Sequence, residues 1–202
     1  AGARKLADTP HLFRETFNPD SFILVPSTSS ERRCYIPMGF LNEESISTNA
    51  NLIIPNAGIY HFGILESLIH MAWMRTVAGR LKSDYRYSAA VVYNNFPWPE
   101  PTEAQKAKIE KTAQGILDAR ALYPDSSLAD LYDDSLMPIE LRKAHQANDK
   151  AVLEAYGFPT KDFSESDIVA KLFEMYEALI KKEQDVAKEK PQKAKRTGKA
   201  KD

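Results

Sequence analysis

The sequence predicts an α+β fold, with a domain of mixed strands and helices followed by a small all-helical bundle. Short β-branched and aromatic runs separated by Pro, Asn and Ser occupy the first hundred residues, whereas the last hundred show helical periodicity. The chain has 202 residues of which 43% are hydrophobic, enough for one core and a smaller second one. We expect a mixed domain at 1–99, a helical domain at 100–186 and a disordered basic tail at 187–202.

Four segments of the first half have the composition of strands bounded by polar loops. They read SFILVPSTSS, RRCYIPMGFL, NLIIPNAG and YRYSAAVVYNNF. One long helix is expected between the last two, from about Ile59 to Ala78. Asn56 is a possible N-cap for it, and Gly79 stands where a helix C-terminus favours a left-handed residue.

Three amphipathic helices are expected in the second half and would form the bundle. The first begins near Thr102, where Thr-Glu-Ala-Gln is a start signal. The second follows Pro138 and ends at Gly157, and the third begins after Ser164 or Ser166. Their apolar faces would include Ile109, Ala113, Ile116, Leu141, Ala144, Asn148, Val152, Ile168, Leu172, Met175 and Leu179.

Composition limits the function classes. The net charge of -1 argues against a uniformly basic nucleic-acid coat, so an anion-binding surface must be a local patch. A single cysteine, Cys34, excludes an internal disulfide and a Cys-rich zinc site; it fits a cytoplasmic location and is expected to be a small buried hydrophobe. No signal peptide is visible, and charged residues interrupt the longest apolar run, so no transmembrane segment is expected.

Several kinds of catalytic site are not indicated. The glycines are dispersed without GxG or P-loop spacing, which argues against a nucleotide or S-adenosylmethionine site in these residues. The histidines form no HExxH pattern; His61 and His70 are expected in the core, and His145 is expected to contact Asp149 one helical turn away. NNFPWP has the wrong order for an Asn-Pro-Pro-aromatic methyltransferase loop and is interpreted as a strand end with an aromatic plug.

The stretch KSDYRYSAAVVYNN would have two different faces as an extended strand, because successive side chains alternate. The inward face would carry Tyr85, Tyr87, Ala89, Val91 and Tyr93. The polar face would carry Lys82, Asp84, Arg86, Ser88 and Asn94.

The polar face has two interpretations. It could be a solvated strand edge with surface ion pairs. Alternatively, Lys82 could donate to O6 and N7 of a guanine while Asp84 accepts from N4 of the paired cytosine. Arg75, Arg80 and Arg86 would then hold phosphates and fix the register.

Long phrases of the chain resemble the C-terminal part of the MmeI-like family of bacterial DNA adenine methyltransferases, the type IIL (type IIG-like) restriction-modification proteins and related methylases of phage-defence systems. They read LIIPNAGIYHFGILESLIHMAWMRTVAGRLKSDYRYSAAVVYNNFPWPEP and LADLYDDSLMPIELRKAHQANDKAVLEAYGF. The resemblance extends from about Leu12 to about Tyr176. It implies that the chain corresponds to the target recognition domain and the C-terminal helical domain of a larger enzyme.

The resemblance also implies roles. The parent would transfer a methyl group from S-adenosylmethionine to N6 of a flipped adenine, whereas this fragment would hold no catalytic or cofactor residue. Its partners would be double-stranded DNA and the methyltransferase domain of the same polypeptide. Lys82 and Asp84 would select one base pair, with Ser83, Tyr85 and Arg86 in support. Further base contacts could come from 27–33 and 49–51. The full predicted set of nucleic-acid-binding residues is Arg75, Arg80, Lys82, Ser83, Asp84, Arg86 and Asn94.

Two other functions fit the same residues. The chain could be a protein-interaction module that docks through its helical half. It could also be a separate specificity subunit of a type I-like restriction system, although such subunits normally show two recognition halves and long spacer helices.

Overall fold

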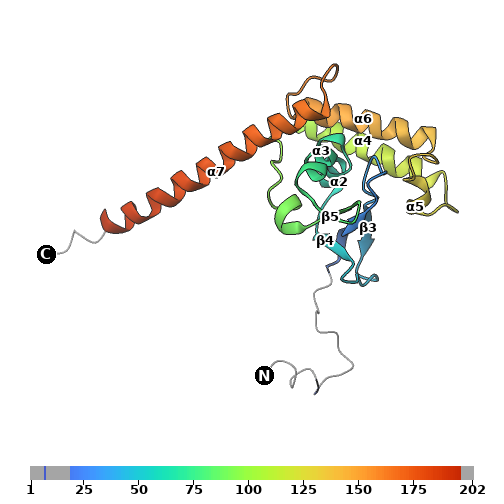
Figure 1. Ribbon diagram of the computed structural model, residues 1–202, viewed down its shortest axis with the longest axis horizontal. Coiled ribbons are helices and arrows are strands. Elements are labelled where there is room, and N and C mark those ends of the chain that lie inside the picture. The colour runs from blue at the N-terminus through green and yellow to red at the C-terminus, as the bar shows by residue number, and fades with distance from the viewer. Residues whose placement is uncertain (1–6, 8–18, 197–202) are drawn as a thin grey trace.

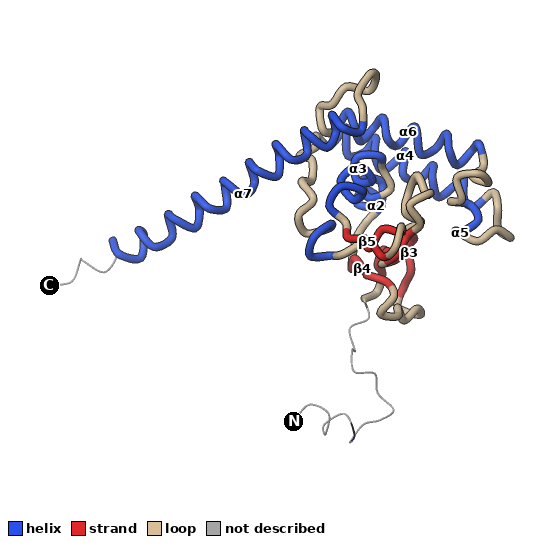
Figure 2. Tube along the Cα trace, viewed as in Figure 1, coloured by secondary structure: helices blue, strands red, loops and turns tan. Residues whose placement is uncertain are grey.

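The strands form two small antiparallel sheets next to a group of helices (Figure 1). The computed structural model describes Ala7 and residues 19–196, and its strands gather at one end of the helical group (Figure 2). The first sheet has the order β3-β1-β4, with β1 (Ser21–Pro26), β3 (Gly39–Asn42) and β4 (Asn51–Pro55). The second has the order β2-β6-β5, with β2 (Thr28–Ser29), β6 (Asp84–Arg86) and β5 (Gly79–Leu81).

β1 is the central strand of the first sheet. Ile23 lies opposite Phe40 on one side and Ile54 on the other. Phe22, Ile23 and Val25 are all buried, so both faces of β1 are covered, which explains why its sequence SFILVP does not alternate with polar residues. Of the predicted strand RRCYIPMGFL, only Gly39 onward pairs as β3, and the residues before it are irregular.

The long helix expected from Ile59 to Ala78 is two helices, α2 (Ile59–Leu65) and α3 (Leu68–Val77). The chain breaks because Ser67 acts as the N-cap of α3, accepting from the His70 amide, while its hydroxyl donates to the Ile64 carbonyl. The predictions at both ends were wrong: Gly58 rather than Asn56 is the N-cap, and Ala78, in an extended conformation, is the C-cap before Gly79.

The single strand expected through KSDYRYSAAVVYNN is also wrong. β5 and β6 form a hairpin whose turn is Lys82 and Ser83, and a π-helix, η1 (Ala89–Tyr93), follows. Lys82 has a left-handed φ of 57°, so the chain reverses direction there although the alternation of side chains in the sequence continues. Asn95 donates to the carbonyls of Ala90 and Val91, and the Trp73 indole donates to the Val92 carbonyl. These bonds hold the π-turn.

Two of the three helices predicted for the bundle, α4 (Glu103–Ala121) and α6 (Ile139–Ala155), pack together, and the short α5 (Leu128–Leu131) lies between them in the chain. The third predicted helix packs on α3 instead, so the three-helix bundle was wrong in this respect. Thr102 caps α4 in a capping box with Gln105, and Gly157, with a φ of 69°, ends α6. The predicted buried faces of both helices agree with the structure at Ile109, Ala113, Ile116, Leu141, Asn148 and Val152.

Gly63 lets α2 pack closely on this bundle. A Cβ built at Gly63 would lie 2.7 Å from Ile109 Cγ2 and 3.0 Å from the Ala113 Cβ. Nδ2 of the Asn148 side chain donates to the Gly63 carbonyl at 2.7 Å. Buried residues of the strand-rich part and of the helical part therefore share one hydrophobic core.

α7 (Glu165–Arg196) packs on α3 with its first part and then extends away from the body of the molecule (Figure 1). Trp73 contacts Phe173 and Tyr176, with ring centroids 5.4 and 5.8 Å apart. Ile168 and Leu172 are buried as predicted, whereas Leu179, expected on the apolar face, is exposed. The backbone of residues 187–196, expected to be a disordered tail, continues α7, and residues 197–202 lie outside the described part.

Candidate nucleic-acid interface

The β5–β6 hairpin sits on a base of buried tyrosines. Tyr85 and Tyr87 are 6% and 3% exposed, which confirms their predicted inward direction. Tyr87 also forms a hydrogen bond of 2.9 Å with Nε2 of the buried His70. Ala89 and Val91, expected on the same inward face, are exposed in η1, where Val92 is buried instead.

Lys82, Asp84 and Arg86 have unengaged charged groups. Lys82 occupies the exposed turn, Asp84 begins β6 and pairs with Leu81, and Arg86 ends β6 in an exposed position. Within residues 19–186, whose side chains the structure describes, the side chains of these three residues form no hydrogen bond or ion pair, so Lys82 and Asp84 do not pair with each other. Their charged groups are therefore available to a ligand at the tip and along the strand of the hairpin.

Arg80 is engaged within the hairpin. Its Nη1 donates to the Ser83 carbonyl at 2.8 Å and lies 3.6 Å from Oε2 of Glu31. Its guanidinium carbon lies 3.9 Å from the centre of the Tyr85 ring. Ser83 is the exposed second residue of the turn.

Arg75, predicted to hold a phosphate, lies on α3 and links three parts of the fold. Its Nη1 donates to Oε2 of Glu165 at 2.9 Å, and its Nη2 donates to the Cys34 carbonyl at 3.1 Å. The side chain is 22% exposed. These contacts hold α7 and the loop before β3 against α3, so Arg75 has a structural role in this fold.

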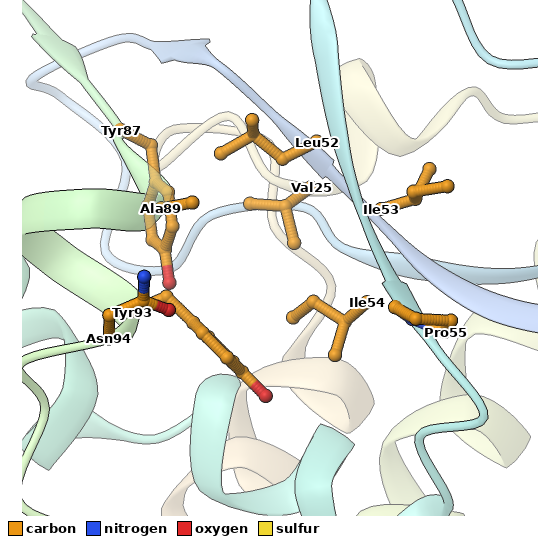
Figure 3. A pocket seen from close by; sticks show the side chains of 9 residues that line it. All are labelled: Val25, Leu52, Ile53, Ile54, Pro55, Tyr87, Ala89, Tyr93 and Asn94. Carbon is orange, nitrogen blue, oxygen red and sulfur yellow. The ribbon is translucent and has the colours of Figure 1, made fainter. Parts of the chain in front are cut away.

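Asn94 is not on a common strand face with Lys82 and Asp84, because η1 intervenes. It lies at the end of η1, beside a pocket of about 370 Å³. Figure 3 shows the aliphatic side chains of β1 and β4 across this pocket from Tyr87, Tyr93 and Asn94. The lining residues are Val25, Leu52, Ile53, Ile54, Pro55, Tyr87, Ala89, Tyr93 and Asn94.

Two loops that the sequence suggested as further base contacts lie beside the hairpin. The Ser27 hydroxyl and amide both donate to the Ala50 carbonyl, at 2.6 and 3.1 Å. The Tyr87 amide donates to the Ser27 carbonyl at 2.9 Å, and Thr28 pairs with Arg86 across the sheet. Hydrogen bonds and strand pairing therefore join residues 27–33, 49–51 and 79–86, which are far apart in the sequence.

A buried polar cluster joins the strand-rich part to the bundle, and sequence reasoning missed most of it. Oε1 of Glu66 accepts from the Met38 amide at 2.8 Å and from Nη2 of Arg120 at 2.9 Å. Arg120 also donates to the Met38 carbonyl and to the Tyr132 hydroxyl. Burial raises the pKa of Glu66 to about 7, against the opposing effect of Arg120.

His145 and Asp149 were predicted to contact each other, but each has other partners. Nε2 of His145 bonds to the Tyr132 hydroxyl and Nδ1 lies 3.2 Å from the Glu66 carbonyl. Asp149 accepts from the Leu68 amide and the Tyr35 hydroxyl, each at 2.6 Å. Burial lowers the pKa of His145 to about 3 and raises that of Asp149 to about 6. His145 is fully buried and Asp149 is partly buried, and the hydrogen bonds of both side chains within the fold indicate a role in packing.

The remaining predictions about single residues have mixed outcomes. Cys34 is half-buried rather than fully buried, and its thiol donates to Asp134 at 3.2 Å; burial, followed by that hydrogen bond, raises its pKa. His70 is a core residue as expected, and burial lowers its pKa to about 3, whereas His61 is only half-buried. Phe96 is buried against His70 and Trp98, which confirms the aromatic plug but after a π-helix instead of a strand.

Among the side chains that the structure describes, no group of three or more His, Cys, Asp or Glu is placed to hold a metal ion. No helix in the described part of the chain combines the length and the apolar character needed to cross a membrane.

Comparisons with known proteins agree with this layout. The family described as MmeI, target recognition domain, matches residues 1–100, and the family described as MmeI, C-terminal domain, matches residues 101–183. DNA methyltransferase A of Bacillus subtilis (strain 168) is 44% identical over 183 residues, covering 90% of this chain and 20% of that protein.

A solved structure is similar as well. The type IIL restriction-modification enzyme MmeI, in complex with DNA, shares 49% identity with a TM-score of 0.83, covering 88% of this chain and 24% of that one. The chain thus spans about a fifth to a quarter of the length of these two relatives. It belongs to the MmeI family, of which it comprises the target recognition domain and the C-terminal domain.

Proposed function

We propose that this region reads one G·C base pair with the β5–β6 hairpin. The observation that carries the proposal is the free pair of charges at the hairpin, Lys82 and Asp84, surrounded by two loops that join the same surface. A two-stranded β-ribbon fits the major groove, where base pairs differ in their donors and acceptors. Lys82 would donate to guanine O6 and N7, and Asp84 would accept from cytosine N4.

The neighbouring groups would fix the register of the hairpin on DNA. Arg86 is exposed and unpaired at the end of β6, so it is suited to a phosphate. The loops at 27–33 and 49–51 lie where further bases or phosphates would pass. The similar MmeI structure is a complex with DNA, which supports double-stranded DNA as the ligand.

The enzyme that contains this region would be an S-adenosylmethionine-dependent methyltransferase acting on N6 of adenine, in a restriction-modification or phage-defence system and in the cytoplasm. The chain offers no glycine-rich strand-to-helix turn for the cofactor, so the cofactor site and the flipped base would belong to the methyltransferase domain of the same polypeptide. The role of this chain would be to position the DNA for that domain.

A charge swap tests the proposed readout. In the full-length polypeptide, Lys82→Glu with Asp84→Arg should change the methylated sequence at one position. Each bidentate contact contributes about 1–3 kcal/mol of discrimination, so the original base pair should lose its preference there. Sequencing that detects methylated bases on random duplex DNA measures the outcome.

A matched control is available on α7. Lys171 and Glu174 form an exposed ion pair of 2.7 Å, remote from the hairpin in sequence. Lys171→Glu with Glu174→Arg applies the same swap of charges and should leave the methylated sequence unchanged. An unchanged sequence in the Lys82 and Asp84 variant, or a complete loss of methylation with no new sequence, would refute the readout roles.

A further inference from the structure

We infer that Arg80 is a positioning residue for sequence readout, a side chain that holds the hairpin turn instead of binding a DNA phosphate. The inference rests on the proposed function, since it concerns how Lys82 and Asp84 are presented. It replaces the expectation that all three arginines near the hairpin contact the DNA backbone.

Three contacts of Arg80 converge on the hairpin and its neighbouring loop. The guanidinium lies over the ring of Tyr85, donates to the carbonyl of Ser83 across the turn, and approaches the carboxylate of Glu31. A planar guanidinium can stack on a ring and donate hydrogen bonds in its own plane at the same time, which an ammonium group cannot do. The combination of contacts is therefore specific to arginine.

The turn held by these contacts is unfavourable for its residue. Lys82 has a φ of 57°, a left-handed conformation that residues other than glycine keep only where the surroundings impose it. Arg80 bonds to the backbone of Ser83, the other turn residue, and its stacking partner Tyr85 is anchored in the core. Arg80 thus connects the exposed turn to the rigid part of the fold.

This connection matters because the side chains proposed to read DNA have no support of their own. Lys82 and Asp84 make no side-chain hydrogen bond or ion pair with any residue in 19–186, the part whose side chains are described. Their relative placement depends on the backbone between Leu81 and Asp84, which the Arg80 contact closes. Without that contact, the distance between the proposed donor and acceptor would vary.

Arg86 provides the matched comparison. It lies on β6 opposite Gly79, is exposed, and has no partner among the described residues. Arg80 and Arg86 therefore lie in the same small sheet, but only the Arg80 side chain contacts other described residues. A phosphate contact is expected of Arg86, and a positioning role of Arg80.

The test uses the full-length polypeptide with the variants Arg80→Lys, Arg80→Ala and Arg86→Ala. Two quantities are measured for each: kcat/KM for methylation of duplexes carrying each base pair at each site position, and the slope of log Kd against log salt concentration. Both Arg80 variants should lower discrimination about tenfold at the one position read by Lys82 and Asp84, with the slope unchanged. Arg86→Ala should reduce the magnitude of the slope by about 0.9 and keep the discrimination.

Arg80→Lys decides between the two roles, because it keeps the charge and the side chain is already 44% exposed, so folding is not at risk. The inference is overturned if Arg80→Lys keeps full discrimination, if Arg80→Ala reduces the slope as a lost phosphate contact would, or if discrimination falls equally at every position. Failure of the proposed function is seen separately: the Lys82 and Asp84 swap then leaves the methylated sequence unchanged.

Discussion

The molecule contains two arginine–glutamate pairs that are alike in chemistry and opposite in environment. In each, an arginine guanidinium lies against a tyrosine ring: Arg80 over Tyr85 with Glu31, and Arg120 over Tyr132 with Glu66. The side chains of the first pair are 44% and 48% exposed, whereas those of the second are 9% and 0% exposed.

Exposure decides what each pair can do. In the buried pair, removing one partner would leave a charge without compensation in the core. If either partner of the exposed pair is removed, water can solvate the other, so the pair contributes little to stability. Arg80 can therefore be specialised for presenting the hairpin, while Arg120 ties the bundle to the loop before β3 and to α2.

The largest expected effect is on the buried pair. Arg120→Leu in this chain should lower the free energy of unfolding by about 3–5 kcal/mol, because Glu66 stays buried without its partner. Adding Glu66→Gln should recover part of the loss, since the uncompensated charge is removed. Arg80→Leu should cost no more than about 1 kcal/mol. Urea unfolding of the unsubstituted chain and the three variants measures these free energies. Equal losses of unfolding free energy in Arg120→Leu and Arg80→Leu would contradict the comparison.

The same variants carry a pH dependence of definite sign. The pKa of Glu66 is raised from 4.5 to about 7 in the folded chain, so the folded state binds the proton more strongly than the unfolded state. This contribution to stability is full below pH 4.5 and is lost as pH rises toward 7. Loss of Arg120 raises the pKa of Glu66 further, so Arg120→Leu should be more damaging at pH 8 than at pH 5.

A smaller effect is expected at Gly63, where α2 packs closely on α4. Gly63→Ala places a Cβ 2.7 Å from Ile109 Cγ2 and should cost about 1–3 kcal/mol of unfolding free energy. Gly115→Ala in α4 is the matched control, because a Cβ there meets no atom within 4 Å. It should stabilise the chain by about 0.5–1 kcal/mol, as expected for glycine in a helix. Thermal unfolding compares the two, and a neutral Gly63→Ala would mean that α2 does not depend on this contact.

Much of the fold could be predicted because its signals are local. Thr102 and Gln105 specify the start of α4, Gly157 ends α6, and the 3.6-residue period identifies the buried faces. The break between α2 and α3 was missed because the apolar pattern continues through it. The Ser67 cap is a local signal, whereas the contacts of Glu66 with Met38 and Arg120 are distant in sequence.

The candidate site was predictable to a similar extent. Alternation correctly placed Tyr85 and Tyr87 inward but was wrong for Ala89 and Val91, and the readout roles of Lys82 and Asp84 stay a prediction. The pattern could not separate a strand from a hairpin, because Lys82 is not a residue that signals a left-handed turn. Nor could it show that Arg75 is engaged by Glu165, a residue 90 positions away.

The smallest expected effect would separate stability from recognition at the turn of the β5–β6 hairpin. Lys82 has a φ of 57°, a conformation that glycine adopts without steric cost. Lys82→Gly therefore relieves backbone strain in the folded state, and this gain should exceed the loss that comes from the greater freedom of the unfolded chain. Unfolding free energy should rise by about 0.5 kcal/mol. In the full-length polypeptide the same variant should lose discrimination at one base pair.

Lys82→Val is the counterpart, because a β-branched residue is disfavoured at positive φ. It should lose both stability and discrimination, so the two variants differ in the sign of the stability change and agree in recognition. If Lys82→Gly instead keeps the full preference for the base pair, the ammonium group of Lys82 does not read DNA. DNA recognition would then not explain why lysine occupies this strained position of the hairpin.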